Sequence, residues 1–387
     1  MQVIYTGEET PEEVTSSIFL AGPTPRDSIT PSWRIPDAIE ILERTGYDGV
    51  VYVPEFRDRD RVVSDDEYVA QVDWEDDKLN MSDCIVFYVD RNLDTMPAFT
   101  TNHEHGEWFQ SGKVIFGAPN HAPKNRYLQL KGKRFGVPQA ETLEETLRLA
   151  VAMVGKGTLR TSGERYVPLQ IWNTPTFQSW YADLKAAGNR LDWARVEWTW
   201  RFPPDYNFVF YWILQVDVFL PKENRSKWNE VVIARPDVST IVLYRHRNMI
   251  TLAKVAIVRE FRSPVSNTDG YVWESAGGSS FKTDDPLLRA VEEVHEETGL
   301  VVSRDQIRQH EARQLAATMS AHKAHLFSVA LTEEQLSWLE NQKGRVFGVE
   351  EDTERTYVDV VSVHELMKNP FMDWSMVGMI LRVLTEV

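Results

Sequence analysis

The chain has 387 residues, of which 42% are hydrophobic and 11% aromatic, a length and composition that favour two or three packed domains. Its 58 acidic and 42 basic residues give a net charge of −16, which argues against a nucleic-acid partner but still allows nucleotide-sized ligands. Cys84 is the single cysteine, the N-terminus does not read as a signal peptide, and the apolar run Phe208 to Leu214 is too short to span a bilayer. We therefore expect a cytoplasmic protein with no disulfide framework and no membrane partner.

Short apolar runs alternate with helical stretches in the first third of the chain. We predict strands at residues 18–21, 50–53, 85–89 and 114–116, and helices at residues 33–44, 67–80, 104–111 and 141–154. Strands that alternate with helices indicate an α/β domain with a doubly wound parallel sheet, which we assign to residues 1–155. Ligands of such sheets bind beyond the carboxyl ends of the strands.

Three polar clusters follow predicted strands or lie on the helices between them. The first holds Gly22, Arg26, Ser32 and Arg34, a turn before a helix that suits a phosphate or a ribose. The second is the acidic stretch that contains Glu75 and Asp77, and the third runs from Phe99 to Lys113 and contains Glu104.

These clusters resemble the nucleoside 2-deoxyribosyltransferase superfamily, particularly its branch that hydrolyses N-glycosides. The nucleophilic glutamate of that family stands in an E-x-G-x5-G-K pattern, which Glu104, Gly106, Gly112 and Lys113 match. An acid eight positions before the aspartate of the next strand helps to hold the sugar, and this position is Glu75, with Asp77 as a nearby substitute. The resemblance covers residues 16–130.

Glu104 also has a purely structural interpretation. Thr101-x-x-Glu104 is a capping-box sequence, in which the glutamate only reaches back to the helix start. The matching glycines favour catalysis, because cleavage of an N-glycosidic bond builds positive charge on the sugar that a carboxylate stabilises or attacks. A second carboxyl group, here Glu75, protonates the base or orients a hydroxyl group.

The middle of the chain changes character and becomes rich in tryptophan and β-branched residues. Strand-like runs at residues 196–200, 209–218 and 231–234 predict a leading sheet over about residues 160–240. We assign this sheet to a C-terminal domain over residues 156–387.

Four glutamates crowd one helical segment of the C-terminal domain: Glu292, Glu293, Glu296 and Glu297. Like charges one turn apart destabilise a helix, and a divalent cation with oxygen ligands would offset the repulsion. The strand and glycine turn at residues 273–278 lie just upstream, so a Mg²⁺–pyrophosphate site is plausible. A solvated acidic helix face is the structural alternative.

This stretch resembles the box of the Nudix hydrolases, G-x5-E-x7-R-E-U-x-E-E-x-G-U, with every spacing kept. The resemblance implies an α/β/α sandwich with a mixed sheet, Mg²⁺ or Mn²⁺ on Glu293, Glu296 and Glu297, and substrate contact at Gly278. Two positions depart from the box, since Asp284 replaces its first glutamate and Glu292 its arginine. Arg289 is one possible substitute for the missing ion pair.

The strand before the box is similar to that of the ADP-ribose pyrophosphatase subgroup, which places Arg262 near the substrate. The general base of that subgroup comes from an acidic loop after the box. Glu350 and Glu351 are the candidates here, with Glu296 as a further catalytic acid, although an acidic loop is also often only solvated.

Two hypotheses of function follow. The first is a bifunctional nucleotide hydrolase, which cleaves a nucleoside diphosphate linkage in one half and cleaves or transfers an N-glycosidic bond in the other, as in turnover of NAD and ADP-ribose or of modified nucleotides. The second is a nucleotide sensor whose Nudix half binds without cutting. Both resembled families commonly form oligomers, so a homodimer is expected.

Overall fold

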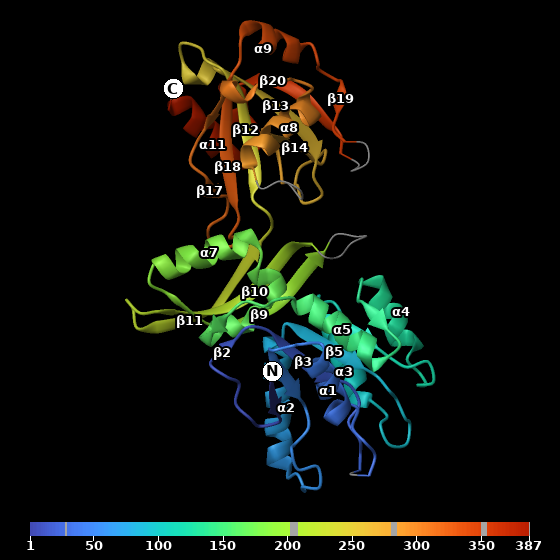
Figure 1. The fold of residues 1–387 in the computed structure, drawn as a ribbon. Helices are drawn as coiled ribbons and strands as arrows, with labels where there is room; N and C mark the ends of the chain where they lie inside the picture. Colours follow the sequence, from blue (N-terminus) through green and yellow to red (C-terminus); the bar gives the residue numbers. More distant parts are fainter. Residues whose placement is uncertain (28, 202–207, 280–284, 350–353, 387) are drawn as a thin grey trace. The chain divides into compact units, whose positions relative to one another are not determined.

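The computed structural model describes residues 1–27, 29–201, 208–279, 285–349 and 354–386. The chain folds into two compact units, Met1–Ala234 and Arg235–Val387 (Figure 1). The described parts of both units include no helix that is long and apolar enough to cross a membrane.

The first unit contains a six-stranded sheet in which all neighbouring strands run parallel. Its order is β1-β4-β3-β5-β6-β7. After β3 the chain forms β4 on one side of it, and then crosses over to form β5, β6 and β7 on the other side. The strands are β1 (Gln2–Tyr5), β3 (Ser17–Ala21), β4 (Val50–Val53), β5 (Cys84–Tyr88), β6 (Val114–Gly117) and β7 (Gln139–Ala140). This is the parallel, doubly wound arrangement that the alternating sequence pattern predicts.

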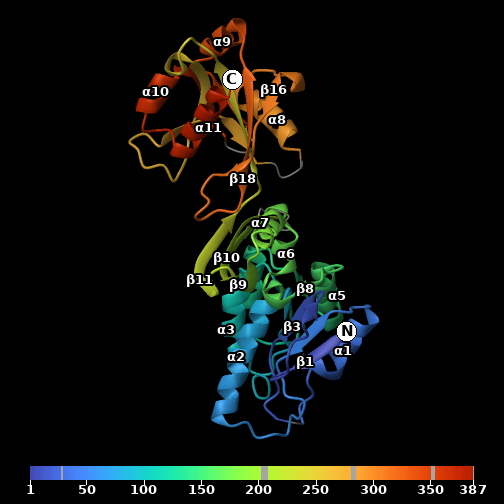
Figure 2. The same cartoon turned by 90° about the vertical axis from the view of Figure 1, so that its left-hand side faces the viewer.

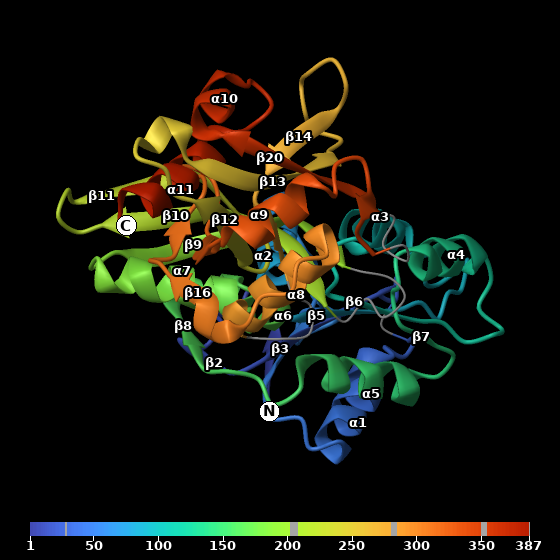
Figure 3. The same cartoon turned by 90° about the horizontal axis from the view of Figure 1, so that it is seen from above.

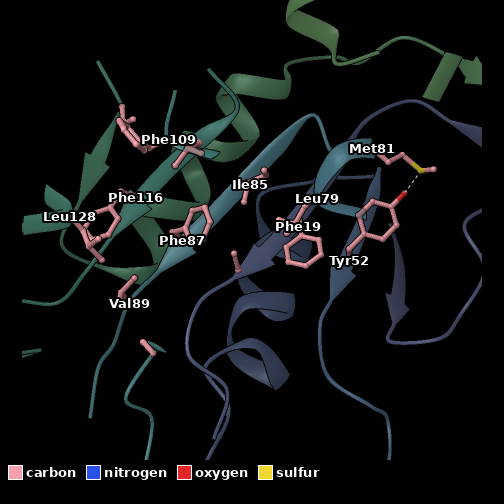
Figure 4. Close-up of a cluster of buried hydrophobic side chains, with 14 of the residues drawn as sticks. Phe19, Tyr52, Leu79, Met81, Ile85, Phe87, Val89, Phe109, Phe116 and Leu128 are labelled. Atoms are coloured by element: carbon pink, nitrogen blue, oxygen red, sulfur yellow. Dashed lines mark hydrogen bonds between the residues drawn. The ribbon is translucent and has the colours of Figure 1, made fainter. Parts of the chain in front are cut away.

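Helices cover both faces of this sheet (Figure 3). One apolar core joins the sheet to α2 (Asp65–Met81), α3 (Phe99–Trp108) and α4 (Arg126–Arg134), with Phe19, Phe87 and Phe116 at its centre (Figure 4). The other core joins the sheet to α1 (Ile39–Arg44) and α5 (Leu143–Val154). Successive strand residues alternate between the two cores, as Ile18 and Phe19 do, because side chains of a strand point to opposite faces.

The helices of this unit begin at the residues that their sequences specify. The Ser64 hydroxyl accepts from Glu67 N, and the Glu67 carboxylate accepts from Ser64 N at 2.9 Å, which forms a capping box at the start of α2. The predicted helix over residues 33–44 is broken instead into a turn at Arg34–Ala38 and α1, since Ile35 has an extended backbone. The predicted helix over residues 104–111 begins earlier, at Phe99.

The tryptophan-rich strands also belong to the first unit. They form an antiparallel sheet of order β11-β10-β9, made of β9 (Arg190–Arg201), β10 (Val209–Leu220) and β11 (Arg225–Ala234). Asn80 Nδ2 donates to Ala194 O at 3.0 Å, and Arg201 Nη2 donates to Gly112 O at 3.0 Å, so this sheet is bonded to the parallel-sheet domain. The two units therefore divide after Ala234, whereas we expected a domain boundary after residue 155.

Smaller elements complete the first unit. They are β2 (Glu13–Val14), which pairs with β8 (Arg160–Thr161), the 3-10 helix Ser162–Tyr166, α6 (Leu169–Trp172) and α7 (Pro175–Ala186). Arg160 donates to both oxygens of Asp83, at 2.8 and 2.5 Å, and thereby fastens β8 to the start of β5.

The second unit contains a mixed sheet whose main path is β16-β18-β12-β13-β20-β19. Only the pairing of β12 with β18 is parallel among its described strand pairs. The strands are β12 (Val238–Arg245), β13 (Lys254–Phe261), β14 (Tyr271–Glu274), β15 (Ala276–Gly278), β16 (Ile307–Gln309), β17 (Arg313–Gln314), β18 (Lys323–Ala330), β19 (Val346–Phe347) and β20 (Thr356–Ser362).

Helices pack on both faces of the mixed sheet (Figure 2). One core joins the sheet to α8 (Pro286–Thr298) and α9 (Glu333–Glu340), and the other joins it to α10 (Val363–Lys368) and α11 (Trp374–Thr385). The second unit is thus an α/β/α sandwich. Short 3-10 helices at Ile250–Leu252 and Arg304–Gln306 connect its elements.

Candidate functional site

Gly22 lies at the point where the strand order of the parallel sheet reverses. It follows β3, which lies between β4 and β5, and a crevice forms beyond strand ends at such a point. The φ angle of Gly22 is +138°, and a Cβ atom there would lie 2.5 Å from Tyr88 O at the end of β5. Only glycine fits this turn, because any side chain would collide with the neighbouring strand.

A buried arginine holds the same turn in place. The Arg34 guanidinium donates to three backbone carbonyls, Leu20 O at 2.7 Å, Gly22 O at 2.7 Å and Pro23 O at 3.3 Å. It also pairs with the Glu55 carboxylate at 2.8 Å, and both side chains are almost fully buried. The expectation that Arg34 binds a phosphate is therefore corrected, since its donors are used inside the protein.

Ser32 belongs to the same internal network. Its hydroxyl donates to Glu55 Oε1 at 2.6 Å and accepts from Arg34 N at 3.1 Å, and the residue is buried. Ser32 thus positions Glu55 and does not face a ligand, contrary to expectation. Glu55 was missed by the sequence reasoning, although it follows β4 and the strand-end rule points to that position.

Glu75 and Glu104 are brought close enough for their charges to interact. Burial, followed by the neighbouring charge of Glu75, raises the pKa of Glu104 to about 7. Burial also raises the pKa of Glu75. The Arg34 charge opposes both shifts, so the two carboxyl groups lie near the arginine that holds the Gly22 turn.

The start of α3 rules out the capping role of Glu104. The helix begins at Phe99, so Thr101 lies inside it and is buried, and Ala98 is the capping residue. Arg91 braces this start by donating to Pro97 O at 2.6 Å and to Asn102 Oδ1 at 2.7 Å. Glu104 is therefore held on a fixed helix in the middle of its length.

A cavity of about 350 Å³ is lined mainly by residues that follow β3 and β4. Gln71 lines this cavity and donates from Nε2 to Glu75 Oε1 at 2.7 Å. Arg26 lines it from the turn after β3, with its guanidinium carbon 5.9 Å from the centre of the Phe99 ring. Arg26 is exposed, which leaves it accessible to a ligand.

Other residues of the matched pattern have structural roles. Asp77 accepts from the Tyr166 hydroxyl at 2.9 Å and pairs with Lys78 at 2.6 Å, so it does not replace Glu75. Lys113 is fully buried and donates to Leu79 O and Asn80 O at 2.8 and 2.9 Å, where it satisfies the last carbonyls of α2. Burial lowers the pKa of His105 to about 4, and the ring packs among Phe87, Phe109 and Phe116.

In the second unit, α8 carries the acidic cluster and begins and ends as the sequence indicates. Asp285 Oδ1 accepts from Leu287 N at 3.0 Å, Pro286 follows, and Gly299 ends the helix with φ +71°. Gly277 N donates to Glu297 Oε2 at 2.9 Å, and a Cβ atom on Gly278 would lie 1.9 Å from Glu293 Oε1. The glycine turn therefore closes directly on the glutamates of α8.

Arg289 compensates part of the crowded negative charge. It pairs with Glu293, and it lies 3.2 Å from Glu292 and 3.5 Å from Glu296. Arg289 thus pairs with acids of its own helix, and its expected role as a substitute for the box arginine stays a prediction. Asp284 lies outside the described residues.

Three carboxylates from separate elements meet at Glu297. Oxygens of Glu260 on β13, Glu297 on α8 and Glu354 lie within 4.8 Å of one another. Glu260 and Glu297 are buried, and burial together with the neighbouring carboxylates raises the pKa of Glu260 to about 7 and that of Glu297 well above its usual range. Clustered carboxylates are the ligand set of a hard divalent cation, so these residues fit Mg²⁺ or Mn²⁺.

The expected metal ligands are only partly brought together. Glu297 is in the group, whereas Glu293 is held by Arg289 and the Glu296 side chain is 32% exposed beside the same arginine. Glu260 and Glu354 were missed, since their positions lie 37 and 57 residues from Glu297 in the sequence (297 − 260 and 354 − 297). Glu350 and Glu351 lie outside the described residues.

Arg262 faces the same acidic group. It lies 2.8 Å from Glu260 Oε2 and 2.9 Å from Glu274 Oε2, and the Glu274 and Glu260 charges help to raise its pKa against the effect of burial. Arg262 therefore neutralises part of the charge of Glu260 and Glu274. Its contact with a substrate stays a prediction.

The parallel sheet of the first unit is that of a doubly wound α/β domain. Residues 15–122 match the family model described as "Nucleoside 2-deoxyribosyltransferase like". These residues therefore form a nucleoside 2-deoxyribosyltransferase-like domain, and the matched range includes Gly22, Glu75 and Glu104. No curated protein matches the chain.

Proposed function

We propose that the first unit cleaves or transfers the N-glycosidic bond of a nucleoside or nucleotide, with Glu104 as the nucleophile. The observation that carries this proposal is the half-buried pair of Glu75 and Glu104, with interacting charges, in a domain that resembles the nucleoside 2-deoxyribosyltransferases. Glu55 and Arg34 act as positioning residues, because Arg34 holds the turn after β3 and is paired with Glu55.

The two carboxyl groups divide the work of the reaction. The ionised Glu104 carboxylate forms a bond to C1′ of the sugar as the bond between C1′ and the base nitrogen breaks. The base leaves with the electron pair of that bond and takes a proton from water, while the Glu75 carboxylate accepts a hydrogen bond from a sugar hydroxyl group. Water, or the nitrogen of a second base, then attacks C1′ and gives its proton to the Glu75 carboxylate, and Glu104 is released as a carboxylate.

Release of free base tests this proposal. We expect the wild-type protein to release base from a panel of ribo- and deoxyribonucleosides and their 5′-monophosphates, measured by chromatography and mass spectrometry. Glu104→Gln should lower the rate roughly 10²–10⁴-fold, because it removes the attacking carboxylate and keeps the shape. Glu107→Gln is the matched control, since Glu107 is exposed on the same helix. Equal rates for the two variants would exclude Glu104 as the nucleophile.

We infer a second activity for the second unit, a cation-dependent hydrolysis of a nucleoside diphosphate linkage. It is supported by the group of Glu260, Glu297 and Glu354 and by the resemblance of α8 and its glycine turn to the Nudix box. A divalent cation bound there would neutralise the diphosphate and activate water. The chain residues hold the site, since Gly277 N fixes Glu297 and Arg289 fixes Glu293.

A panel that includes NAD, ADP-ribose, CTP and deoxynucleoside monophosphates separates the activities. Free base reports the first unit, and a cleaved diphosphate that needs Mg²⁺ and is lost in Glu297→Gln reports the second. Should the second unit bind these nucleotides and release no phosphate product in either protein, a sensor function replaces hydrolysis. A sequence of both reactions on one substrate would support the bifunctional hydrolase.

A further inference from the structure

An aromatic patch around one arginine lies on the mixed sheet of the second unit. We call it the Arg259 patch, and it consists of Arg259 and Phe261 of β13, Tyr271 and Trp273 of β14, and Tyr357 of β20. Arg259 pairs with Trp273 on one side and with Tyr357 on the other, so these three side chains share one face of the sheet. Trp273 packs against the core that contains α11, whereas the adjacent Glu260 meets Glu297 of α8 on the other face. The patch is therefore separate from the proposed cation site.

Two tyrosine rings hold the Arg259 guanidinium in place. Its central carbon lies 5.2 Å from the centre of the Tyr271 ring and 5.3 Å from the centre of the Tyr357 ring. The two rings are in edge contact with each other, with their centres 6.2 Å apart and their planes at 64°. Phe261 packs edge-on against Tyr271 and is 56% exposed. The cation–π contacts stabilise the positive charge without supplying an oxygen acceptor for its N–H groups.

The Arg259 patch contains hydrogen-bond donors for which the described part of the chain supplies no acceptor. Arg259 Nε is buried without a hydrogen-bond partner, and the guanidinium forms no ion pair with a described residue. Within the same described ranges, the Tyr271 and Tyr357 hydroxyls and Trp273 Nε1 form no hydrogen bond either. Buried polar groups of folded proteins almost always have a partner, so this surplus of donors requires an explanation.

The acids on the neighbouring strands are paired elsewhere. Glu260 and Glu274 lie 2.8 and 2.9 Å from Arg262, and Asp359 of β20 lies 3.5 Å from Lys343. These three carboxylates therefore do not neutralise the arginine of the patch.

We propose that the Arg259 patch binds the oxyanion, a phosphoryl or carboxylate group, of a small ligand on the face of the sheet opposite to the proposed cation site. An arginine has five N–H donors and no acceptor, so the complementary atoms of a ligand are negatively charged oxygens. The planar guanidinium binds such oxygens through paired, charge-assisted hydrogen bonds. The exposed Phe261 ring offers an apolar contact to the part of the ligand that carries the oxyanion.

Isothermal titration calorimetry on the full chain tests this site with two probes, phenyl phosphate and benzoate. The buffer contains no divalent cation, so the proposed cation site does not contribute to binding. We expect the wild type to bind at least one of the probes. Arg259→Met should weaken that binding at least about tenfold, because the charge-assisted hydrogen bonds to the oxyanion are lost. Arg259→Lys keeps the charge but loses the planar fork, and it should weaken binding by less than Arg259→Met.

Arg313→Met is the matched control. It removes the same charge from the same unit, but Arg313 is exposed on β17 and pairs with Glu311 at 2.7 Å. It should leave the affinity for both probes unchanged. A variant with both Tyr271→Phe and Tyr357→Phe keeps the rings and removes only the hydroxyl donors. It should weaken binding about threefold or more, and it decides the test if Arg259→Met does not fold.

The possible outcomes decide both the site and the kind of oxyanion. Selective loss of phenyl phosphate binding in Arg259→Met supports a phosphoryl site, and selective loss of benzoate binding supports a carboxylate site. The proposal is overturned if the wild type binds neither probe, or if Arg259→Met binds both as tightly as the wild type does. Because the measurement needs neither turnover nor a cation, such a result would leave the two proposed activities standing.

Discussion

At the residue scale, the protonation of Glu104 depends on burial and on two neighbouring charges. Burial and the Glu75 charge raise its pKa to about 7, against the opposing effect of the Arg34 charge. A nucleophile must be ionised, so we expect the rate to rise as the pH increases through about 7. This rise is the acid limb of the pH–rate profile. Removal of the Glu75 charge and removal of the Arg34 charge should shift it in opposite directions.

Glu75→Gln removes the negative charge that opposes ionisation of Glu104. The pKa of Glu104 should fall, and the acid limb of the profile of kcat/KM against pH should move to lower pH. The maximal rate should also fall roughly 10²–10⁴-fold, because the carboxylate that takes the proton of the attacking water is lost. A limb that stays at the wild-type position would show that the two carboxyl groups do not interact.

Arg34→Met removes the positive charge, the ion pair with Glu55 and the hydrogen bonds to Leu20, Gly22, Pro23 and Thr24. The acid limb should move to higher pH, opposite to Glu75→Gln, and the protein should lose roughly 3–5 kcal/mol of stability because the buried Glu55 carboxylate loses its ion pair with Arg34. Chemical denaturation measures the stability. The double variant Arg34→Met with Glu55→Gln should regain part of the lost stability. If its stability recovers while its pH profile stays different from that of the wild type, the charge of Arg34 and its packing have separate effects.

At the element scale, the contact between the turn at β15 and α8 decides how the acids of the second unit are arranged. Gly277 donates to Glu297, and Gly278 leaves space for Glu293. The helix can carry its glutamates at this spacing because Arg289, Gly277 N and the cation that we propose each offset part of their repulsion.

Gly278→Ala should disturb this contact. The added methyl group would lie 1.9 Å from Glu293 Oε1, so Glu293 has to leave its contact with Arg289. We expect a loss of about 1–3 kcal/mol, measured by denaturant unfolding, and weaker cation binding. Gly378→Ala is the control, since Gly378 lies inside α11 with no atom within 4 Å of an added Cβ, and it should be stabilised by roughly 0.5–1 kcal/mol. Equal effects at both glycines would contradict a close approach at Gly278.

At the scale of the whole molecule, the two units each have their own apolar cores, and we propose a separate activity for each unit. A ligand that binds one unit should therefore stabilise that unit directly. The carboxylate pair of the first unit and the carboxylate group of the second unit can be examined separately in the intact protein.

Magnesium should raise the unfolding temperature of the second unit in scanning calorimetry. A ligand that binds only the folded state contributes about 2.7 kcal/mol at a hundred times its dissociation constant. Glu297→Gln should remove this gain and should stabilise the second unit in the absence of the cation, because one buried negative charge is lost. Glu104→Gln should leave the magnesium effect unchanged. A magnesium-induced shift that persists in Glu297→Gln would place the cation elsewhere.

Much of the fold followed from local patterns in the sequence. The strands after residues 16, 49 and 83 and the helices α2, α5 and α8 lie close to their predicted positions, because apolar alternation, capping residues and glycines act within a few residues. The N-terminal resemblance is confirmed by the family match, and the sandwich of the second unit has the predicted mixed sheet. The sequence by itself also determined that Glu104 and Glu75 are acids worth testing, since their spacing to neighbouring glycines and strands is local.

Only the tertiary structure decided which candidate side chains face a ligand. Arg34 and Arg26 stand eight positions apart in one polar segment (34 − 26), yet the first is buried against Glu55 and the second lines a cavity. Glu260 and Glu354 join Glu297 because β13, α8 and the segment before β20 meet in space. Spacing along a chain determines which residues share a helix face or a strand face, whereas burial and charge pairing depend on elements that come together only when the sheets are assembled.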